Sequence, residues 1–520
     1  MKRADVVIVG SGVGGSAVAW QLAGTGLDVL VLERGEALPR ELENWDAEAV
    51  FGQLRYRAKE TWTDGDGRRY RPGQYYFVGG HTKFFGTAMF RFREADFEAL
   101  EHEEGVSPAW PIKYDDIEPY YDLAERLFGV RGAAGEDPTE PSRSHGYPHP
   151  PIPDEPVIAR LRHALHAQGL HPFHMPSAID LGDGGHCVRC ATCDAFPCRI
   201  DAKGDAETRL LRPALQKGGV RLMTGARVSR LVTDASGRRI EAAIVETRQG
   251  TQTIGGDLFV LSAGAVNSAA LLLASKNDKW PRGLANSSDA VGRYYMNHNC
   301  TAILAIDPRS VNDTRFPKTL SINDFYFGGT HDRWPLGNLQ MLGKIREPML
   351  RGAMPYVPGV ALRYLADHSV DLYAMSEDLP RPQSRVELRE DGGIRLSWRR
   401  TNLKPHERLV DKAKRMLKHA GFPLVMSRRF GDDTPSHQCG TVRFGADPST
   451  APLDERCKAY DHENLYVVDA SFFPSSAALN PALTIAAQAL RVGEHLRTVL
   501  GTPSKPVGIT PCSQGDHHVS

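Results

Sequence analysis

The stretch DVVIVGSGVGGSAVAWQLAGTGLDVLVLERG, residues 5–35, decides the fold class of this chain. It begins with an apolar, β-branched run over residues 6–9, which is typical of a buried parallel strand. Three glycines follow in the order G-x-G-x-x-G and open a segment that we predict to be helical over about residues 14–23. A second apolar run ends at Glu33, which is placed to accept a hydrogen bond from a ribose hydroxyl. The pattern predicts a Rossmann-like dinucleotide-binding unit.

The residues of the glycine turn each meet a steric or electrostatic requirement. Gly10 allows the tight turn, Gly12 lets a pyrophosphate approach the backbone, and Gly15 lets the helix pack closely on the strand. Val13 and Gly14 lie at the N-terminus of the helix, where phosphate groups bind. A glycine-rich turn in an ordinary α/β domain is the alternative. The turn suits both NAD and FAD, and no second fingerprint of this kind follows it.

Length and composition exclude several classes of protein. The chain has 520 residues, which suits two interwoven domains with large cores. Its 63 basic and 63 acidic residues balance, so we expect no nucleic-acid partner. The apolar runs are too short to cross a bilayer, and a buried strand rather than a signal peptide begins near residue 4. We therefore expect a cytoplasmic protein without a membrane partner. Eight cysteines do not make a disulfide scaffold in a chain of this length.

Three stretches further along the chain have residues suited to close contact with a nucleotide. In YYFVGGHTKFFG, Gly79, Gly80 and Thr82 form a turn that a flat ring or a phosphate could approach. A tight turn beneath packed phenylalanines is the alternative there. Val228 lies in a predicted strand and could offer its backbone to an adenine. Ala263 lies in a turn of small residues between a buried strand and a helix, where a nucleotide could also approach.

Four cysteines form a separate cluster in the sequence. They have the spacing C-x2-C-x2-C-x4-C, and they are Cys187, Cys190, Cys193 and Cys198. The last gap is one residue longer than in the ferredoxin pattern, and no proline follows the last cysteine. An iron–sulfur cluster, a zinc site, and ordinary thiols or a disulfide all remain open. We favour the structural interpretation and predict no metal in the reaction itself.

The C-terminal region returns to a strand, a turn and a helix over residues 463–496. The predicted strand ends at Asp469 and Ala470, which are placed to meet a ribityl or phosphate group. Asn480 and Pro481 open the helix, where Asn480 could simply be its N-cap and Pro481 its first residue. A histidine in SHQCGTVRFG, residues 436–445, would on its own more often be structural, but it forms an ordered set with these residues.

Read in order, these motifs resemble the glucose-methanol-choline (GMC) oxidoreductase family through nearly the whole chain. Besides the N-terminal fingerprint, the resemblance rests on VGGHTKFFG, WPIKYDDIEPYYDLAE, LSAGAVNSAALLL, VGRYYMNH, SHQCGTVRFG and NLYVVDASFFPSSAALNPALTIAAQALR. The stretches GGHTKFFGTAMFR and FPCRIDAKGDAETRLLRPAL are similar to the bacterial sugar-oxidising branch, which is related to pyranose oxidase and includes glycoside 3-oxidases and aminoglycoside alcohol oxidases.

The resemblance implies an enzyme that oxidises a sugar or glycoside hydroxyl with FAD. His437 matches the active-site histidine of the family and Asn480 its partner. The expected reaction converts a secondary pyranoside alcohol at C3 or C2 to a ketone, with the hydride passing to flavin N5, the proton to His437, and O2 as reoxidant. Alternatives are an aminoglycoside primary-alcohol oxidase, a dehydrogenase that uses another electron acceptor, and a flavoprotein that holds FAD without redox chemistry. The small-molecule substrate is the main partner expected, and a homo-oligomer is compatible with the sequence.

The resemblance also gives the cofactor contacts and the mode of attachment. Relatives with covalent flavin carry a histidine four positions after Gly80, where this chain has Phe84, so we expect noncovalent FAD; His81 lies nearby but out of register. The expected FAD contacts are Gly10, Gly12, Val13, Gly14, Gly15, Glu33, Gly79, Gly80, Thr82, Val228, Ala263, Asp469, Ala470, Asn480, Pro481 and Leu483.

The predicted fold class is α/β, with a Rossmann-like FAD-binding domain and a discontinuous α+β substrate domain built on an antiparallel sheet. Strand-like alternation in TAILAI, SRVELRE and GIRLSW indicates that sheet. We expect the FAD-binding domain in residues 1–97, 181–299 and 437–502, and the substrate domain in residues 98–180 and 300–436, with a proline-rich lid or excursion near 131–156 and a flexible tail over 503–520.

Overall fold

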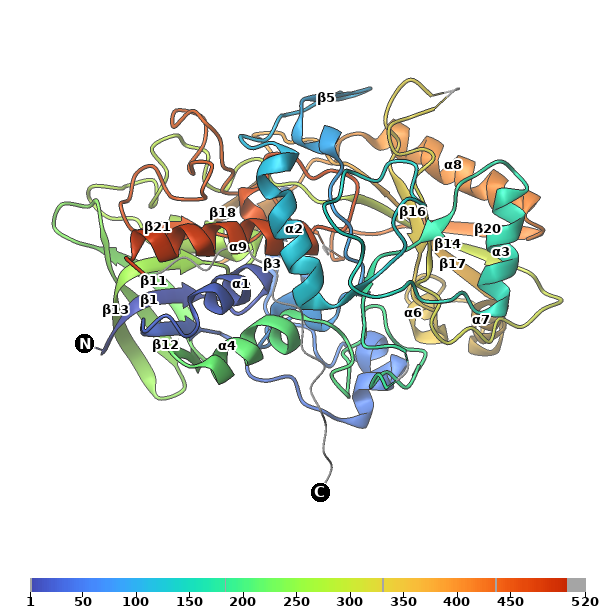
Figure 1. Ribbon diagram of the computed structural model, residues 1–520, viewed down its shortest axis with the longest axis horizontal. Coiled ribbons are helices and arrows are strands. Elements are labelled where there is room, and N and C mark those ends of the chain that lie inside the picture. Colours follow the sequence, from blue (N-terminus) through green and yellow to red (C-terminus); the bar gives the residue numbers. More distant parts are fainter. Residues whose placement is uncertain (1, 183, 330–331, 435–436, 503–520) are drawn as a thin grey trace.

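The computed structural model describes residues 2–182, 184–329, 332–434 and 437–502. The predicted tail, 503–520, lies outside the described residues. Figure 1 shows two parts beside one another, one built on the sheet that contains β1 and the other on the sheet that contains β14. This is the expected α/β architecture of a Rossmann-like domain with a second, antiparallel domain.

The first sheet has seven strands and is mixed. Along its main path the order is β10 (Val220–Met223), β2 (Val29–Leu32), β1 (Lys2–Val9), β13 (Gly250–Leu261), β12 (Ile240–Thr247) and β11 (Arg227–Thr233), and β21 (Leu465–Val467) also pairs with β13. The pairs from β10 through β2 and β1 to β13, and from β13 to β21, are parallel, whereas β11, β12 and β13 are antiparallel. The carboxyl ends of these five parallel strands therefore meet at one edge.

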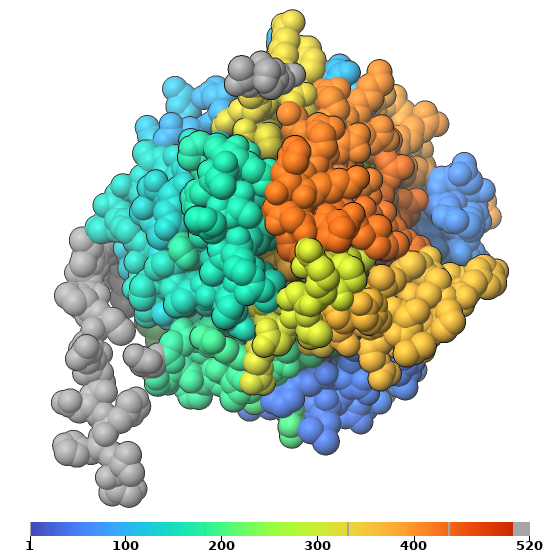
Figure 2. Space-filling view, turned by 90° about the vertical axis from the view of Figure 1, so that its right-hand side faces the viewer, coloured from blue at the N-terminus to red at the C-terminus, as the bar shows by residue number. Residues whose placement is uncertain are grey.

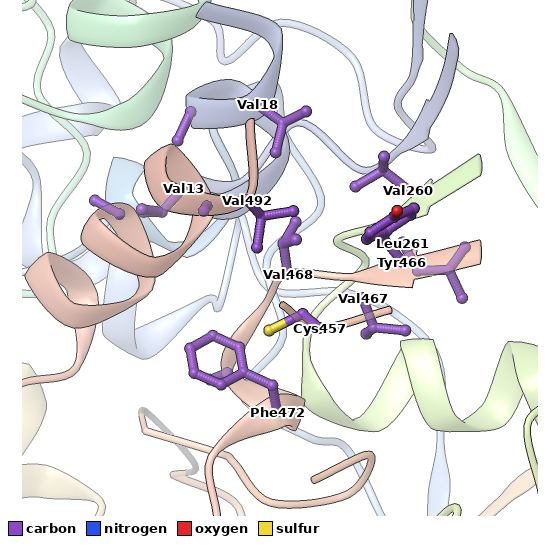
Figure 3. Close-up of a cluster of buried hydrophobic side chains, with 14 of the residues drawn as sticks. Val13, Val18, Val260, Leu261, Cys457, Tyr466, Val467, Val468, Phe472 and Val492 are labelled. Atoms are coloured by element: carbon purple, nitrogen blue, oxygen red, sulfur yellow. The ribbon is translucent and has the colours of Figure 1, made fainter. Parts of the chain in front are cut away.

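Two helices from opposite ends of the chain stack against this sheet. Helix α1 (Val13–Leu22) is buried around almost its whole surface, because its small residues let neighbouring elements approach from several sides. Helix α9 (Ala482–Val499) packs along it, and Figure 3 shows Val492 of α9 beside Val468, the residue that follows β21, in a core cluster that also includes Val18 of α1. Helix α2 (Tyr114–Phe128) packs on α9, α5 (Ala265–Ala274) follows β13, and α4 (Arg212–Lys217) precedes β10.

The second sheet has six antiparallel strands, with helices packed against both of its faces. Its order is β20 (Leu424–Arg429), β14 (Asn299–Ile306), β17 (Ser369–Ser376), β16 (Asn338–Met341), β15 (Leu320–Ile322) and β8 (Phe173–His174). On β14, Ile303 and Ala305 face α3 (Pro156–His166) and α8 (Leu403–His419), while Leu304 and Ile306 face α6 (Glu347–Arg351) and α7 (Gly359–Asp367). Figure 2 shows this end of the molecule, with α3 in teal, α8 in orange and the segment of α6 and α7 in gold.

The remaining elements are short. We expected the hairpin of β18 (Arg385–Leu388) and β19 (Ile394–Ser397) to belong to the six-stranded sheet. It forms a separate four-stranded sheet instead, with β3 (Trp62–Asp64) and β4 (Arg69–Tyr70). Two further strand pairs are β5 (Leu100–His102) with β6 (Gly105–Ser107) and β7 (Val130–Arg131) with β9 (Ser177–Ala178). Single turns of 3₁₀- or π-helix are η1 (Leu42–Trp45), η2 (Glu48–Gly52), η3 (Gly80–Lys83), η4 (Glu94–Phe97), η5 (Glu207–Leu211) and η6 (Ala470–Phe472).

The proline-rich segment 131–156 runs over the surface between β7 and α3 and is tied to the body by polar contacts. Arg143 pairs with Glu125 on α2, and Ser144 donates to Glu118 on the same helix. Asp137 pairs with Arg93. Over the described ranges, none of the helices combines the length and the apolarity needed to cross a membrane.

Candidate active site

The ends of four of the five parallel strands converge on one cavity of about 1320 Å³. Gly10 follows β1, Glu33 follows β2, Ala263 lies two residues beyond β13, and Asp469 lies two residues beyond β21. All four line the cavity. Open α/β sheets bind their ligands in this position, outside the carboxyl ends of the strands. The cavity then continues to the inner face of the six-stranded sheet, where it reaches Leu304.

The glycine turn fits a bound pyrophosphate. At Gly10, Gly14 and Gly15 an added Cβ would lie 2.1–2.2 Å from a backbone oxygen of the protein, so these glycines are needed for packing. At Gly12 the nearest atom would be the Ser262 carbonyl oxygen at 4.0 Å, and Gly12 lines the cavity. A side chain at Gly12 would therefore occupy ligand space instead of protein space. Together with the N-terminus of α1, this open backbone makes a cradle suited to the phosphates of a dinucleotide.

Most of the predicted contacts lie on the cavity wall. The wall includes Gly10, Gly12, Val13, Gly14, Glu33, Gly80, Thr82, Val228, Ala263, Asp469, Ala470, Asn480 and Pro481, together with His437. Gly15, Gly79 and Leu483 lie behind it: Gly15 packs α1 on β1, and Leu483 is fully buried in the core. Phe84 also lines the cavity and stacks on Tyr75 with ring centroids 4.1 Å apart.

Two buried carboxylates hold in place the turns that follow the parallel strands. Glu33 accepts hydrogen bonds from the backbone amide and the hydroxyl of Ser11, at 3.0 and 2.6 Å, and from the amide of Gly35 at 2.8 Å. Asp469 accepts from the amide of Gly264 at 3.0 Å and from the hydroxyl of Ser268. These bonds connect the turn after β13 to the turn after β21.

A hydrogen-bonded pair of histidines, His298 and His437, lies beside Asn480. His298 Nε2 lies 2.9 Å from the carbonyl oxygen of Ser476, and a carbonyl can only accept, so this nitrogen carries a hydrogen. In neutral His298, Nδ1 is then an acceptor, and His437 Nδ1, 2.8 Å away, must donate to it. His437 Nε2 is left with a free lone pair, and the nearest polar group is Asn480 Nδ2 at 3.5 Å.

The orientation of the Asn480 amide is set by a second chain of hydrogen bonds. Gln340 Nε2 donates to Asn480 Oδ1 at 2.9 Å and to Asn338 Oδ1 at 2.8 Å. Asn338 Nδ2 donates to Asn323 Oδ1 at 2.7 Å, and Asn323 Nδ2 donates to the carboxylate of Asp137 at 2.8 Å. Because the oxygen of Asn480 is occupied, its NH2 group is the part that faces His437.

The electrostatic environment keeps His437 neutral. Burial lowers the pKa of His437 well below its usual range, and the neighbouring His298, Lys318 and His81 lower it further. Burial also lowers the pKa of His298, and that of His81 to about 4. A neutral imidazole with a free Nε2 can accept a proton from a hydroxyl group.

The four clustered cysteines do not reach this site. They line a separate cavity of about 20 Å³, and none of the four is in a disulfide. Over the described part of the chain, no three His, Cys, Asp or Glu side chains are arranged to hold a metal ion. Burial raises the pKa of the Cys193 thiol to about 12, so this group is a protonated thiol at neutral pH.

One interpretation from the sequence is wrong in its structural detail. Helix α9 begins at Ala482 with Pro481 as its N-cap residue, and no side chain caps it. The Asn480 side chain bonds to Gln340 and faces His437 instead. Asn480 is therefore not a plain N-cap.

The fold places a phosphate cradle and a neutral histidine pair around one cavity, which is the arrangement of a nucleotide-binding enzyme. Sequence models of GMC oxidoreductases match residues 4–300 and 380–489. The chain belongs to the GMC oxidoreductase family, whose members are FAD-dependent alcohol oxidases and dehydrogenases.

Individual relatives are similar over nearly their whole length. The 6'''-hydroxyparomomycin C oxidase of Streptomyces lividus is 31% identical over 95% of this chain and 92% of its own. The paromamine 6'-oxidase of Streptomyces fradiae is also 31% identical, over 94% and 90%. Among solved structures, pyridoxine 4-oxidase from Mesorbium loti has a TM-score of 0.67 at 20% identity and covers 95% of this chain and 99% of its own.

The sequence motifs assigned no role to three residues of the site. His298 lies within the quoted motif VGRYYMNH but received no role, and Gln340 and Lys318 lie in segments that showed no motif. A signal for His298 was present: Asn297 and His298 come directly before β14, in which all eight residues are buried. Polar side chains that enter a fully buried strand need specific partners.

Proposed function

We propose that this protein oxidises a secondary hydroxyl of a sugar or glycoside, at C3 or C2 of a pyranoside, with FAD as the cofactor and O2 as the reoxidant. The observation that carries this proposal is the free lone pair of His437 Nε2 beside the Asn480 amide, in the cavity that also contains the phosphate cradle. FAD, when bound, supplies the hydride acceptor N5.

The residues of the chain provide the other half of the reaction. Oxidation of an alcohol to a ketone removes a hydride from carbon and a proton from oxygen. His437 Nε2 takes the proton, and the Asn480 NH2 group donates a hydrogen bond to the alcohol oxygen. At 3.5 Å the two groups are too far apart to hold each other strongly, so both are available to a substrate. Gln340 keeps the amide oriented before the substrate arrives.

A primary alcohol of an aminoglycoside is the second candidate substrate. The observation in its favour is that the names of two relatives, each 31% identical to this chain, describe oxidases of paromamine and of 6'''-hydroxyparomomycin C. The active-site pair would act in the same way on a primary alcohol, so the distinction depends on the substrate half of the cavity. The electron acceptor can be O2 or another oxidant, and peroxide formation distinguishes them.

The test is anaerobic reduction of the flavin by a panel of pyranosides, in the parent and in His437→Ala. The parent should bleach with a glycoside, and His437→Ala should keep FAD but be reduced roughly a hundred- to ten-thousand-fold more slowly, because the proton acceptor is lost. Asn480→Ala should be milder, since it removes orientation and not the acceptor. A folded His437→Ala that is reduced as fast as the parent would refute the proposal. Product analysis by NMR then identifies the oxidised carbon.

A further inference from the structure

The substrate half of the cavity has an apolar wall. The cavity is lined by Leu304 on β14 and by the segment that contains α6, including Leu342, Ile345, Pro348 and Met349. None of these five side chains offers a hydrogen bond. They line the same cavity as the polar pair His437 and Asn480, and Leu342 follows by two residues the Gln340 that bonds to Asn480, so a ligand at His437 that carries a bulky substituent can reach this wall.

The carboxylates of this half are already bound. Asp194 accepts from the ammonium group of Lys318 at 2.9 Å and from the backbone amide of Gly343 at 3.1 Å. Asp433 lies at the exposed rim, 3.6 Å from Arg57. The other acidic side chains on the cavity wall are Glu60, which pairs with Arg34 at 3.1 Å, and Glu33 and Asp469 at the carboxyl ends of the parallel strands. A ligand ammonium group would therefore find no free carboxylate near the apolar wall.

One positive charge without an acidic partner also lines the cavity. The charge of Lys318 is balanced by Asp194, 2.9 Å away. Arg428 lines the cavity, is exposed, and forms no ion pair within the described ranges. A polycation that enters would lose hydration and meet like charge. A neutral ligand with an apolar group would lose little and would gain contact with the wall.

We propose that the substrate is an uncharged pyranoside with an apolar aglycone, and that polycationic aminoglycosides are excluded. This rests on the proposed function and specifies the substrate class for the same site. The sugar hydroxyl lies between His437 and Asn480, and the aglycone packs against the wall formed by α6 and its flanks. The chain thus differs in substrate class from its relatives named as paromamine and hydroxyparomomycin oxidases.

The test compares matched ligands on the FAD-loaded enzyme. Methyl and phenyl glycosides of glucose, galactose, mannose and xylose, together with paromamine, are measured by anaerobic flavin reduction and by perturbation of the flavin spectrum, which reports binding without turnover. For the sugar that reduces the flavin, the phenyl glycoside should bind roughly tenfold or more tightly than the methyl glycoside, because its ring leaves water for an apolar wall. Paromamine should neither perturb the spectrum nor reduce the flavin.

A second test introduces a carboxylate into the apolar wall. Met349→Asp should weaken phenyl-glycoside binding at least tenfold and allow paromamine to perturb the flavin spectrum. Val360→Asp is the matched control, since Val360 is 79% exposed on the neighbouring helix α7 and does not line the cavity; it should behave as the parent.

The possible results separate the two proposals. Paromamine that reduces the flavin as well as the best glycoside would overturn this inference and leave the aminoglycoside function standing. Equal affinity for methyl and phenyl glycosides would overturn the role of the apolar wall. If no pyranoside and no aminoglycoside reduces the flavin, the proposed function itself fails.

Discussion

Replacement of His298 tests whether the histidine pair sets the protonation of the base. His298→Leu removes the acceptor of the His437 Nδ1 hydrogen, which lies 2.8 Å from His298 Nδ1. An unpaired buried donor costs roughly 1–3 kcal/mol. The ring of His437 can avoid this cost by moving its hydrogen to Nε2, but that tautomer cannot accept the substrate proton. Since about 1.4 kcal/mol corresponds to a tenfold change in rate, hydride transfer should slow roughly 5- to 150-fold.

The pH dependence gives a second and independent readout. His298 is one of the causes, after burial, that lower the pKa of His437. In the parent the base is lost only when the pH falls through this lowered pKa, so the rate of flavin reduction should stay constant from pH 8 to below 6.5. In His298→Leu one cause of the lowering is gone, and the acid limb should move upward toward pH 6.5.

The assay is anaerobic stopped-flow reduction of the flavin over pH, with FAD content and thermal stability measured on each variant. His298→Asn should restore part of the rate, because an amide oxygen can accept the hydrogen from His437. His406→Leu is the control: His406 is also buried, with its pKa lowered to about 3 mainly by burial, but it bonds to Thr301 and Ser376 away from the cavity. If His298→Leu folds, binds FAD, and keeps both the parent rate and the parent pH profile, the tautomer argument is wrong.

The remaining predictions concern the cofactor and the cysteines. Gly12→Ala should fold without retaining FAD, whereas Gly14→Ala should fail to fold, because its Cβ would lie 2.2 Å from the Val468 carbonyl oxygen. Circular dichroism measures folding and flavin absorbance measures FAD content. A Gly12→Ala variant with the full flavin absorbance of the parent would show that Gly12 is not part of the phosphate site. Acid precipitation should release FAD into the supernatant, because Phe84 occupies the tethering position, and flavin in the pellet would disprove this. The Cys190→Ser, Cys193→Ser double variant should keep substrate-dependent flavin reduction; its loss in a folded variant, with stoichiometric iron and sulfide in the parent, would assign the cluster to electron transfer.

The cofactor half of the fold could be predicted because its information is local. The apolar runs of β1, β2, β13 and β21 each end directly at a turn of glycines, small residues or an acidic residue. Buried parallel strands need such runs, and a nucleotide at their carboxyl ends needs such turns. The strand, the turn and the following helix are adjacent in sequence, so the pattern alone indicates the position of the ligand.

The polar pairs of the active site could not be predicted because they join distant segments. His298 and His437 are separated by 139 residues, and Gln340 and Asn480 by 140. No periodicity relates such positions, and single histidines and amides are common in any chain. Asn480 shows the ambiguity best: before a proline and a helix it has the local context of an N-cap, and only the position of β16 gives its side chain another partner.

In the proposed function, the two hydrogen-bond chains supply both groups that the alcohol needs without a charged catalytic residue. One chain ends at the Ser476 carbonyl and the other at the Asp137 carboxylate, and both of these groups can only accept. Because the Ser476 carbonyl accepts from His298 Nε2, His298 Nδ1 must accept from His437 Nδ1, and His437 Nε2 keeps a free lone pair. From Asp137 the direction of each hydrogen bond is set through three amides to a free NH2 group on Asn480. A substrate hydroxyl needs an acceptor for its proton and a donor for its oxygen, and the two chains present these groups at the place where they meet. An acidic residue at either position would raise the pKa of the base and attract cations, so amides and neutral imidazoles suit the oxidation of an uncharged alcohol better than ionised groups do.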